Sequence, residues 1–185
     1  MTARTVAALY VDVERGPYPK LVGVDCWDSN RDATGYRGPH PVVAHPPCGY
    51  WGRYRHRCHD DGSTGFWAVD AVRTWGGVLE QPADSRLFDV LNMPAPGWLP
   101  DAWGGYTLHV AQADYCHPAL KPTWLYVVGV PPSVAVAHLA EWKQRRSPTL
   151  VPVERMAKSK RHLTPPALAV ALVAIARSAD VTVRR

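Results

Sequence analysis

The stretch Pro41-Val42-Val43-Ala44-His45-Pro46-Pro47-Cys48 decides the fold class and locates the chemistry. Its first half is a short apolar run, which is typical of a strand buried on both faces of a sheet. Its second half places a histidine, two prolines and a cysteine immediately after that strand. Because proline restricts the backbone, the thiol of Cys48 is held in one place. We therefore expect the functional site at the end of this strand.

Short apolar runs of the same kind lie on both sides of this stretch, and we expect them to be further strands. Helical spacing is instead present in Phe66 to Trp75, which Gly76-Gly77 stops. A second helix is expected near residue 170, where Thr164 is a candidate N-cap, Pro165 suits the first helical position and Ala167 to Ala179 supplies helix formers. The expected strands are Thr5 to Val13, Leu21 to Val24, Val78 to Glu80, Trp124 to Val130 and a short one at Tyr106 to Val110.

Strands and helices that alternate in this way predict an α/β fold. We expect a Rossmann-like open, mainly parallel sheet with helices on both faces, joined by loops rich in Pro, Gly and Trp. The chain has 185 residues, of which 46% are hydrophobic and 20% charged. A chain of this size and composition can bury one sizeable core, so we expect residues 1–185 to form a single domain.

Charge and cysteine usage indicate the class of partner and the compartment. Lys and Arg number 21 against 16 Asp and Glu, which is compatible with nucleic acid or a nucleotide as partner but lacks the dense basic stripe of a DNA clamp. The four cysteines are widely spread and no secretory signal is evident, so we expect a cytoplasmic protein with free thiols. The apolar stretch around Pro165 to Ala176 is too short to span a bilayer, and no membrane segment is expected. The sequence leaves the oligomeric state open.

Polar residues of the types that take part in catalysis and ligand binding follow several of the expected strands. In parallel sheets, ligands bind outside the carboxyl ends of the strands, so these side chains are expected to converge in space. The expected set is Asp12, Glu14, Asp25, Cys48 and Glu80.

Cys48 is the candidate nucleophile. A fixed thiol suits covalent attack once neighbouring cations, such as Arg53, Arg55 or the histidines, lower its pKa. The alternative is a half-buried structural cysteine. No metal site is expected, because the stretch His56 to Asp60 and the histidines upstream do not reproduce the spacing of a Cys-x-x-Cys pair or of a zinc finger.

Four motifs, in order, resemble those of DNA cytosine-5 methyltransferases. Pro47-Cys48 resembles their Pro-Cys motif, and Leu79-Glu80-Gln81-Pro82 resembles their Glu-Asn motif. Tyr115 to Leu125 is similar to a stretch of small phage-borne cytosine methyltransferase-like proteins. Leu163 to Ala169 resembles the Pro-Pro helix start that closes the cofactor site in the same enzymes. The resemblance covers roughly residues 40 to 176.

The resemblance implies a minimal methyltransferase-like domain without a separate target-recognition domain. It also implies a role for each of two residues. Cys48 would attack C6 of a pyrimidine, and Glu80 would hydrogen-bond the ring near N3, so that C5 takes a methyl or other one-carbon group. The substrate would be a nucleic acid or a pyrimidine nucleotide.

The cofactor that the resemblance implies is S-adenosylmethionine. The family's Gly-rich loop follows the first strand, where this chain has Val11 to Pro19 with the single glycine Gly16, a departure from the pattern. Asp25 is a candidate for the ribose hydroxyls and Trp27 for stacking on adenine; a solvated acid and a core tryptophan are the alternatives. The candidate cofactor-binding residues are Asp12, Glu14, Gly16, Asp25, Trp27 and Thr164.

Substrate contacts are expected from a basic loop with interleaved aromatic residues, which suits phosphate contact combined with base stacking. The alternative is a solvated face over core aromatics. The residues of this loop are Tyr50, Trp51, Arg53, Tyr54, Arg55 and Arg57. A second basic run, Arg155 to His162, either binds phosphate or carboxylate beside the last helix or is solvated. The candidate substrate-binding residues are His45, Pro47, Arg53, Arg55, His117 and Lys121, with loop structure as the alternative for the last two.

Two other functions stay open at this point. One is a catalytically degenerate protein of the methyltransferase fold that binds nucleic acid or a partner protein, which the single-glycine loop favours. The other is transfer of a one-carbon group to pyrimidine C5 from a different donor. The retained Cys48 and Glu80 favour an enzyme over the degenerate protein.

Overall fold

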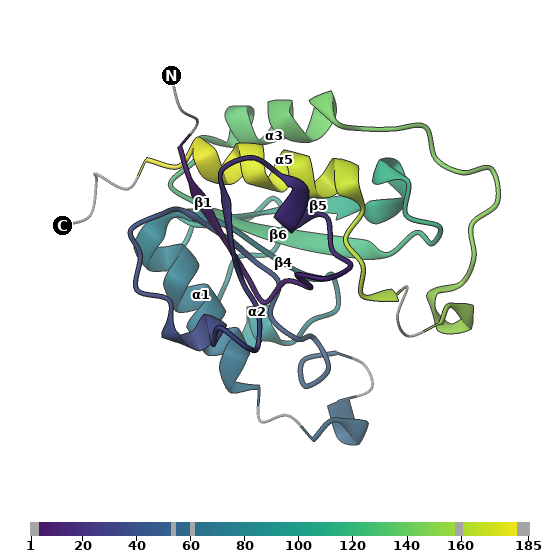
Figure 1. Ribbon diagram of the computed structural model, residues 1–185, viewed down its shortest axis with the longest axis horizontal. Coiled ribbons are helices and arrows are strands. Elements are labelled where there is room, and N and C mark those ends of the chain that lie inside the picture. The colour runs from purple at the N-terminus through teal and green to yellow at the C-terminus, as the bar shows by residue number, and fades with distance from the viewer. Residues whose placement is uncertain (1–3, 53–54, 60–61, 158–160, 181–185) are drawn as a thin grey trace.

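Six strands form one mixed sheet in the computed structural model, which describes residues 4–52, 55–59, 62–157 and 161–180 (Figure 1). The strand order across the sheet is β2-β1-β3-β4-β6-β5. Strands β1 to β4 run parallel, whereas β6 is antiparallel to both of its neighbours. The expectation of an α/β fold with a mainly parallel sheet is therefore confirmed. The strands are β1 (Val6–Leu9), β2 (Val24–Trp27), β3 (Val42–Ala44), β4 (Gly77–Pro82), β5 (Tyr106–Ala111) and β6 (Pro122–Val128).

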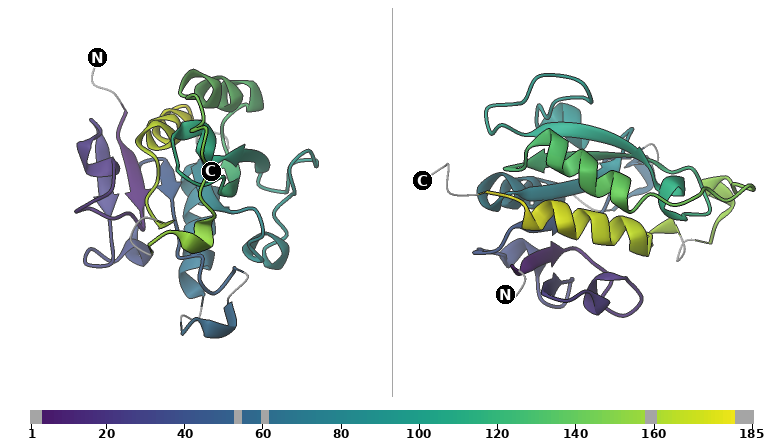
Figure 2. Two further views of the ribbon diagram at one scale, coloured as in Figure 1. Left: turned by 90° about the vertical axis from the view of Figure 1, so that its right-hand side faces the viewer. Right: turned by 90° about the horizontal axis from the view of Figure 1, so that it is seen from above.

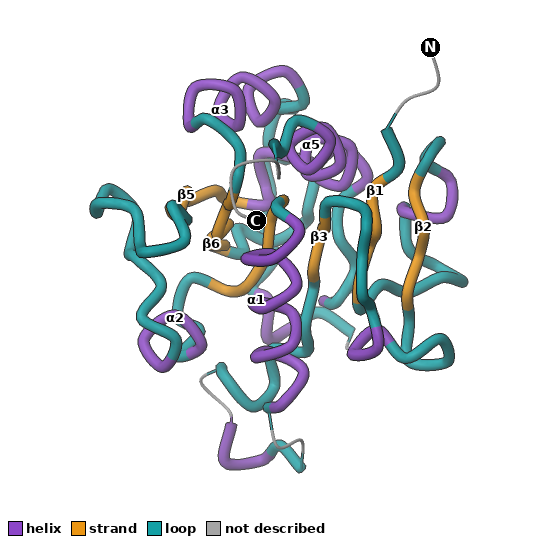
Figure 3. Tube along the Cα trace, turned by 90° about the vertical axis from the view of Figure 1, so that its left-hand side faces the viewer, coloured by secondary structure: helices purple, strands orange, loops and turns teal. Residues whose placement is uncertain are grey.

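Helices cover both faces of this sheet, as Figures 2 and 3 show. On one face α1 packs against β3 and β4, and on the other α5 packs against β1, β3 and β4 with α3 beside it. The helices are α1 (Ser63–Trp75), α2 (Leu87–Val90), α3 (Pro132–Glu141) and α5 (Pro166–Arg177). None of the helices in the described part of the chain is long and apolar enough to cross a membrane.

The central strands are buried on both faces, which explains their unbroken apolar sequences. Successive side chains of a strand point to opposite faces. In β1, Val6 and Ala8 join the apolar cluster under α5, whereas Ala7 and Leu9 join the cluster under α1. All four side chains are fully buried.

Several expected boundaries were wrong. The helix α1 begins at Ser63 and not at Phe66, β4 runs on past Glu80 to Pro82, and β6 spans Pro122–Val128 instead of Trp124 to Val130. β1 ends at Leu9, because Tyr10 has a φ of 60° and leaves the extended conformation. β2 begins at Val24, so Asp25 lies inside this strand, paired with Ala7, and does not end it. The cap of α5 is Pro165, which makes no side-chain hydrogen bond, and Thr164 lies one residue before it.

The strand order places a crevice between β1 and β3. From β1 the chain goes outward to β2 on one side, and β3 and β4 continue on the other side. In open α/β sheets such a change of direction is where ligands bind, outside the carboxyl ends of the strands. The loops that follow β1, β3 and β4 therefore meet at one edge of the sheet.

Candidate functional site

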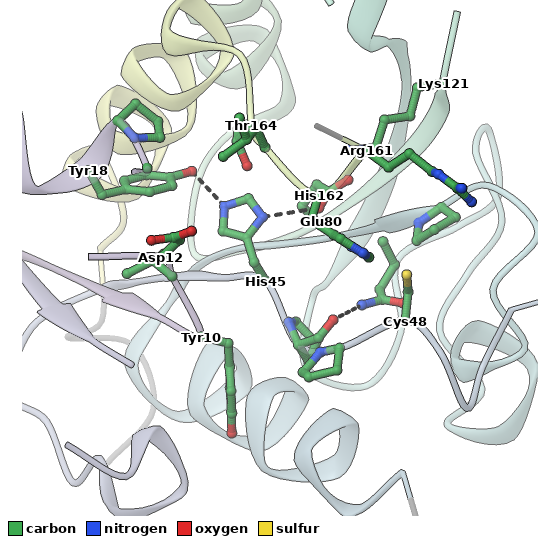
Figure 4. A pocket seen from close by; sticks show the side chains of 18 of the residues that line it. Tyr10, Asp12, Tyr18, His45, Cys48, Glu80, Lys121, Arg161, His162 and Thr164 are labelled. Atoms are coloured by element: carbon green, nitrogen blue, oxygen red, sulfur yellow. Dashed lines mark hydrogen bonds and ion pairs between the residues drawn. The ribbon is translucent and has the colours of Figure 1, made fainter. Parts of the chain in front are cut away.

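A cavity of about 450 Å³ lies at this edge, in the size range of ligand sites (Figure 4). Its walls come from parts of the chain that are far apart in sequence. They are the loop after β1, the loop after β3, the end of β4, Lys121 before β6 and the segment 161–164 before α5. Cys48 and Glu80 both line it, because Cys48 follows β3 and Glu80 lies near the end of the neighbouring parallel strand β4.

His45 stands at the centre of a hydrogen-bond chain across this cavity (Figure 4). Its Nε2 lies 2.5 Å from the hydroxyl of Tyr18, and its Nδ1 lies 3.0 Å from Oε2 of Glu80. The other carboxylate oxygen, Oε1, accepts a hydrogen bond of 2.9 Å from the amide of Gln112. A neutral imidazole satisfies both of its contacts when the Tyr18 hydroxyl donates to Nε2 and Nδ1–H donates to Glu80.

The environment of Glu80 favours the carboxylate form. Burial by itself raises its pKa, but the hydrogen bond and charge of His45 lower it, as do the charge of Lys121 and the hydrogen bond from Gln112. The net result is a pKa below the ordinary value. The pKa of Tyr18 is instead raised well above its ordinary value by complete burial and by the nearby charge of Glu80. The imidazole of His45 thus connects the neutral phenol of Tyr18 to the ionised carboxylate of Glu80.

The loop that carries Cys48 is held from below by β4. The side-chain amide of Gln81 donates to the carbonyl oxygen of Pro46 at 2.6 Å, and its own oxygen accepts from the Ser85 hydroxyl at 3.0 Å. The amide of His45 donates to the carbonyl of Leu9 at 3.0 Å. Gln81 and Ser85 are buried, so these bonds are shielded from water. The position of the cysteine therefore depends on the strand that carries Glu80.

The thiol of Cys48 is not activated in the resting protein. Its pKa is raised, first by burial and then by the charge of Glu80, while Lys121 lowers it. The expectation that nearby cations lower this pKa was therefore wrong in its net direction. Arg55 lies outside the cavity, and Arg53 lies outside the described residues.

The expected cofactor-binding residues do not form one group. Asp12, Gly16 and Thr164 line the cavity, whereas Glu14 lines an adjoining hollow of about 590 Å³. The turn at Asp12 is closed by its own bonds: the amides of Glu14 and Arg15 donate to its side chain, and that of Gly16 to its carbonyl. A Cβ on Gly16 would lie 2.3 Å from this carbonyl oxygen. The glycine is thus needed for the turn itself.

Asp25 and Trp27 form a separate cluster on β2. The indole nitrogen of Trp27 donates to Asp25 at 2.9 Å, and Arg31 forms an ion pair with the same carboxylate. The guanidinium of Arg31 also lies over the Trp27 ring, 3.9 Å from its centre. Burial raises the pKa of Asp25, but the bonds from Arg31 and Trp27 lower it below its ordinary value. Neither side chain lines the cavity that holds Cys48.

The expected substrate-binding residues divide between three places. His45, Pro47 and Lys121 line the cavity. Arg55 lines a surface hollow of about 440 Å³ next to the Cys48 loop, together with Tyr50 and Phe66. His117 is buried in the wall of a separate cavity, which adjoins the one that holds Cys48.

Tyr18, Gln81 and Gln112 were missed in the sequence. Gln81 lies within the Glu-x-Pro motif and could have been found there. Tyr18 lies in a turn rich in proline, and Gln112 precedes the stretch that resembles the family, so neither had a motif to mark it. They belong to the site because the tertiary fold brings residue 18 to His45 after β3 and residue 112 to Glu80 on β4.

Comparison with protein-family models, with curated proteins and with solved structures finds no match for this chain. The site therefore has to be interpreted from its own geometry. Among the described residues, no group of three or more His, Cys, Asp and Glu side chains is arranged to hold a metal ion. All four cysteines are free.

Proposed function

We propose that this protein performs thiol-dependent chemistry at C5 of a pyrimidine in nucleic acid or a nucleotide. One observation carries the proposal: Cys48 and Glu80 line the same cavity at the carboxyl ends of two adjacent parallel strands. A nucleophile and an acid/base group in one cavity are what covalent activation of a pyrimidine requires. The resemblance of their two motifs to cytosine-5 methyltransferases supports the same chemistry.

In the proposed step, Sγ of Cys48 bonds to C6 and the C5=C6 double bond is lost. The thiol proton passes to the Glu80 carboxylate and from there to N3 of the ring, so that charge does not accumulate. Glu80 suits this transfer because its lowered pKa makes it a carboxylate before attack. C5 then behaves as the carbon of an enamine, which reacts with an electrophilic carbon or, in its absence, with a proton from water.

His45 and Gln112 act on this step as positioning residues. Each occupies one oxygen of Glu80, which fixes the plane of the carboxylate and leaves its remaining lone pairs for the ring. Tyr18 in turn fixes the imidazole from the opposite side. Such a shell holds a reacting group in one orientation, which is worth more than its hydrogen bonds alone.

The described residues do not fit S-adenosylmethionine as one set. The turn after β1 uses the amides of Glu14, Arg15 and Gly16 on Asp12, so these three amides are not available to a ligand's carboxylate. Asp25 and Trp27, the proposed ribose and adenine contacts, are bound to Arg31 and to each other outside the cavity. We therefore derive no step through this cofactor, and the proposed chemistry ends at the activated C5 atom.

Nucleic acid is supported as the substrate form by the hollow next to the Cys48 loop. Tyr50 and Phe66 are 39% and 44% exposed, although exposed aromatic rings are costly to leave in water. Arg55 and Arg86 line the same hollow. Aromatic rings beside arginines suit a stacked base and its phosphate, so a nucleotide next to the target would bind here.

The test is exchange of the pyrimidine C5 proton in heavy water, because it needs no carbon donor. Addition of Cys48, deuteration at C5 and loss of the proton return the pyrimidine with deuterium at C5. Proton NMR follows this as loss of the C5–H signal and collapse of the H6 doublet. The substrates are a cytosine-containing single-stranded oligodeoxynucleotide and deoxycytidine monophosphate, and we expect faster exchange in the oligonucleotide.

Variants assign the exchange to the site. Cys48→Ser should abolish it, and Glu80→Gln should slow it by about 100-fold, the scale of general acid–base catalysis. Cys26→Ser is the matched control, since Cys26 lies on β2 outside the cavity, and it should exchange at the rate of the unmodified protein. Exchange that survives Cys48→Ser, or no exchange with either substrate, would contradict the proposal.

A catalytically degenerate protein that binds nucleic acid is the second candidate. The closed turn after β1 and the raised pKa of Cys48 favour it. It predicts tight binding of the oligonucleotide with no exchange at C5, so the same experiment separates the two functions.

A further inference from the structure

His117 has one side of its ring satisfied and the other side without a partner. The side chain is buried, with 3% of its surface exposed. Its Nδ1 lies 3.0 Å from both the amide nitrogen and the carbonyl oxygen of Ala119, so this nitrogen can accept or donate. Its Nε2 is buried and has no hydrogen-bond partner among the described residues.

An unpaired nitrogen of this kind costs free energy, because the buried group has lost its hydrogen bonds to water without replacing them. Native structures leave few such groups, and each one calls for a specific explanation. A bound ligand that pairs with Nε2 is one such explanation. The surroundings of His117 indicate what kind of ligand fits.

His117 lines a cavity of about 420 Å³ that adjoins the site of Cys48. Both cavities have Gly16, Pro17, Leu163 and Thr164 in their walls, so the chain at these residues separates them. Most of the lining of the second cavity is apolar. Its apolar side chains include Leu21, Pro118, Met156, Leu163, Pro165 and Pro166.

The charged groups of this second cavity are all positive. Arg15 and Lys20 line it and are exposed, and no acidic side chain is among the described residues of its walls. Arg15 pairs with Asp12, which belongs to the wall of the first cavity. A cationic rim over an apolar floor disfavours a cationic ligand and favours an anionic one.

We propose that this second cavity binds a small organic anion, a carboxylate or phosphate attached to an apolar body. The apolar body lies against Leu21 and Met156, and the anionic group accepts a hydrogen bond from Nε2–H of His117 with Lys20 nearby. The anion can bind whether Nδ1 accepts a hydrogen bond from the amide of Ala119 or donates one to its carbonyl oxygen. If Nδ1 accepts from Ala119, the proton is already on Nε2; if it donates, the anion binds together with one proton.

The site is independent of the thiol chemistry, because none of these contacts involves Cys48 or Glu80. Its position beside the first cavity places the bound anion next to the reaction that we propose there. Failure of one proposal therefore leaves the other standing.

The experiment is NMR of the full-length protein labelled with ¹⁵N-histidine, which resolves the ring nitrogens. Three probes are titrated: benzoate, benzyl alcohol and inorganic phosphate. Benzoate has the charge and the apolar body, benzyl alcohol has only the body, and phosphate has only the charge. We expect benzoate to shift the Nε2 signal of His117 in a saturable way, and to bind more tightly than either other probe.

Variants fix the location. Lys20→Gln should weaken benzoate binding by about two- to fivefold, the scale of a partly exposed ion pair. Arg37→Gln removes an equal charge at the end of the η2 turn (Ala33–Gly35) and should leave it unchanged. His117→Gln should abolish saturable binding, and circular dichroism reports whether this variant is folded. If His117→Gln is not folded, the comparison of Lys20→Gln with Arg37→Gln decides whether benzoate binds in this cavity.

The following results would each overturn the proposal. They are no shift of the His117 ring nitrogens with benzoate at millimolar concentration, equal affinity for benzyl alcohol, and equal weakening by Lys20→Gln and Arg37→Gln. Phosphate binding as tight as benzoate would equally contradict it, because the apolar walls would then contribute nothing.

Discussion

The two reactive side chains of the site hold opposite protonation states. Glu80 is ionised at neutral pH because His45 and Gln112 bind its oxygens, and this negative charge is one reason why the Cys48 thiol keeps its proton. In the function that we propose, a ring that hydrogen-bonds Glu80 would spread the carboxylate charge, which is one of the causes that raise the pKa of the thiol. The resting protein therefore keeps its cysteine protonated, and we expect the proposed substrate to favour the thiolate.

This protection predicts a pattern of alkylation. Iodoacetamide at neutral pH should modify Cys116, which is exposed, before Cys48, because thiolate is the reactive form and burial and Glu80 raise the pKa of Cys48. Peptide mass spectrometry over time measures both rates, and the unfolded chain, in which both react alike, is the control. Faster modification of Cys48 would mean that the thiol is activated without substrate.

His117 predicts a pH dependence of stability. Burial lowers its pKa, as does the charge of Lys121, while the bond to Ala119 and the charge of Glu80 raise it; the net direction is downward. The unfolded chain has the ordinary histidine pKa of about 6.5 and therefore takes up a proton first as the pH falls. Stability present above that pH should be lost as the pH drops through the folded-state pKa.

Urea unfolding at a pH above and a pH below 6.5 measures this loss. His117→Gln should reduce the difference between the two midpoints, whereas His109→Gln, on the exposed side of β5, should leave it as it is. Equal pH dependence in all three proteins would show that His117 titrates normally.

At the scale of elements, the start of β4 decides how closely β3 and β4 approach each other. Gly77 has a φ of 119°, and a Cβ there would lie 2.0 Å from the carbonyl oxygen of Val42 on β3. The close approach sets the register in which Ala44 pairs with Leu79, one residue before His45 and Glu80 respectively. The geometry of the site is therefore set at the opposite end of the strands.

Gly77→Ala should destabilise the protein by about 2–4 kcal/mol, since it combines an unfavourable φ with a backbone clash. Gly97→Ala is the matched control: its φ of 84° is also in the glycine region, but nothing lies within 4 Å of its Cβ. It should cost only about 1 kcal/mol. Urea unfolding compares the two, and equal losses would show that the contact with β3 relaxes freely.

Elements with strong local signals could be predicted, and those shaped by turns could not. The apolar spacing of α1 and the Gly76-Gly77 stop gave its end correctly, and β3 was expected at its observed place. The apolar run from Leu21 instead begins in a turn, because the amide of Leu21 bonds to Tyr18 and Gly23 has a φ of 70°. Periodicity alone cannot separate the end of such a turn from the start of a strand.

The same limit applies to the site. The sequence predicted that Cys48 and Glu80 lie at one edge of the sheet but left open whether their strands are neighbours, and it is the pairing of β3 with β4 that places both residues in one cavity. The residues that hold these groups come from elsewhere: Tyr18, which contacts His45, from the η1 turn (Tyr18–Lys20), and Gln112, which donates to Glu80, from the η4 turn (Gln112–Tyr115). No periodic signal marks such residues, because tertiary folding alone brings them to the edge of the sheet.

At the scale of the whole molecule, the fold offers a ligand crevice but not the cofactor site that the resemblance implies. We expect S-adenosylmethionine at millimolar concentration to leave the melting temperature unchanged, since the turn after β1 is closed and Asp25 is bound by Arg31. Thermal shift measures this, because a ligand at 100 times its dissociation constant adds about 2.7 kcal/mol. Stabilisation that Asp25→Ala removes would restore the cofactor to the site.

The reversal of β6 has a consequence for how the site comes into being. Because β6 runs against its neighbours, the connection from β5 returns to the reactive edge and delivers Gln112 and Lys121 there. The cavity is completed only by Thr164, far along the chain from Tyr10. Contacts so distant in sequence form late in folding. A nascent chain that has already paired β3 with β4 therefore has Cys48 and Glu80 on neighbouring strands without a closed cavity, and we expect the proposed reaction only after α5 docks.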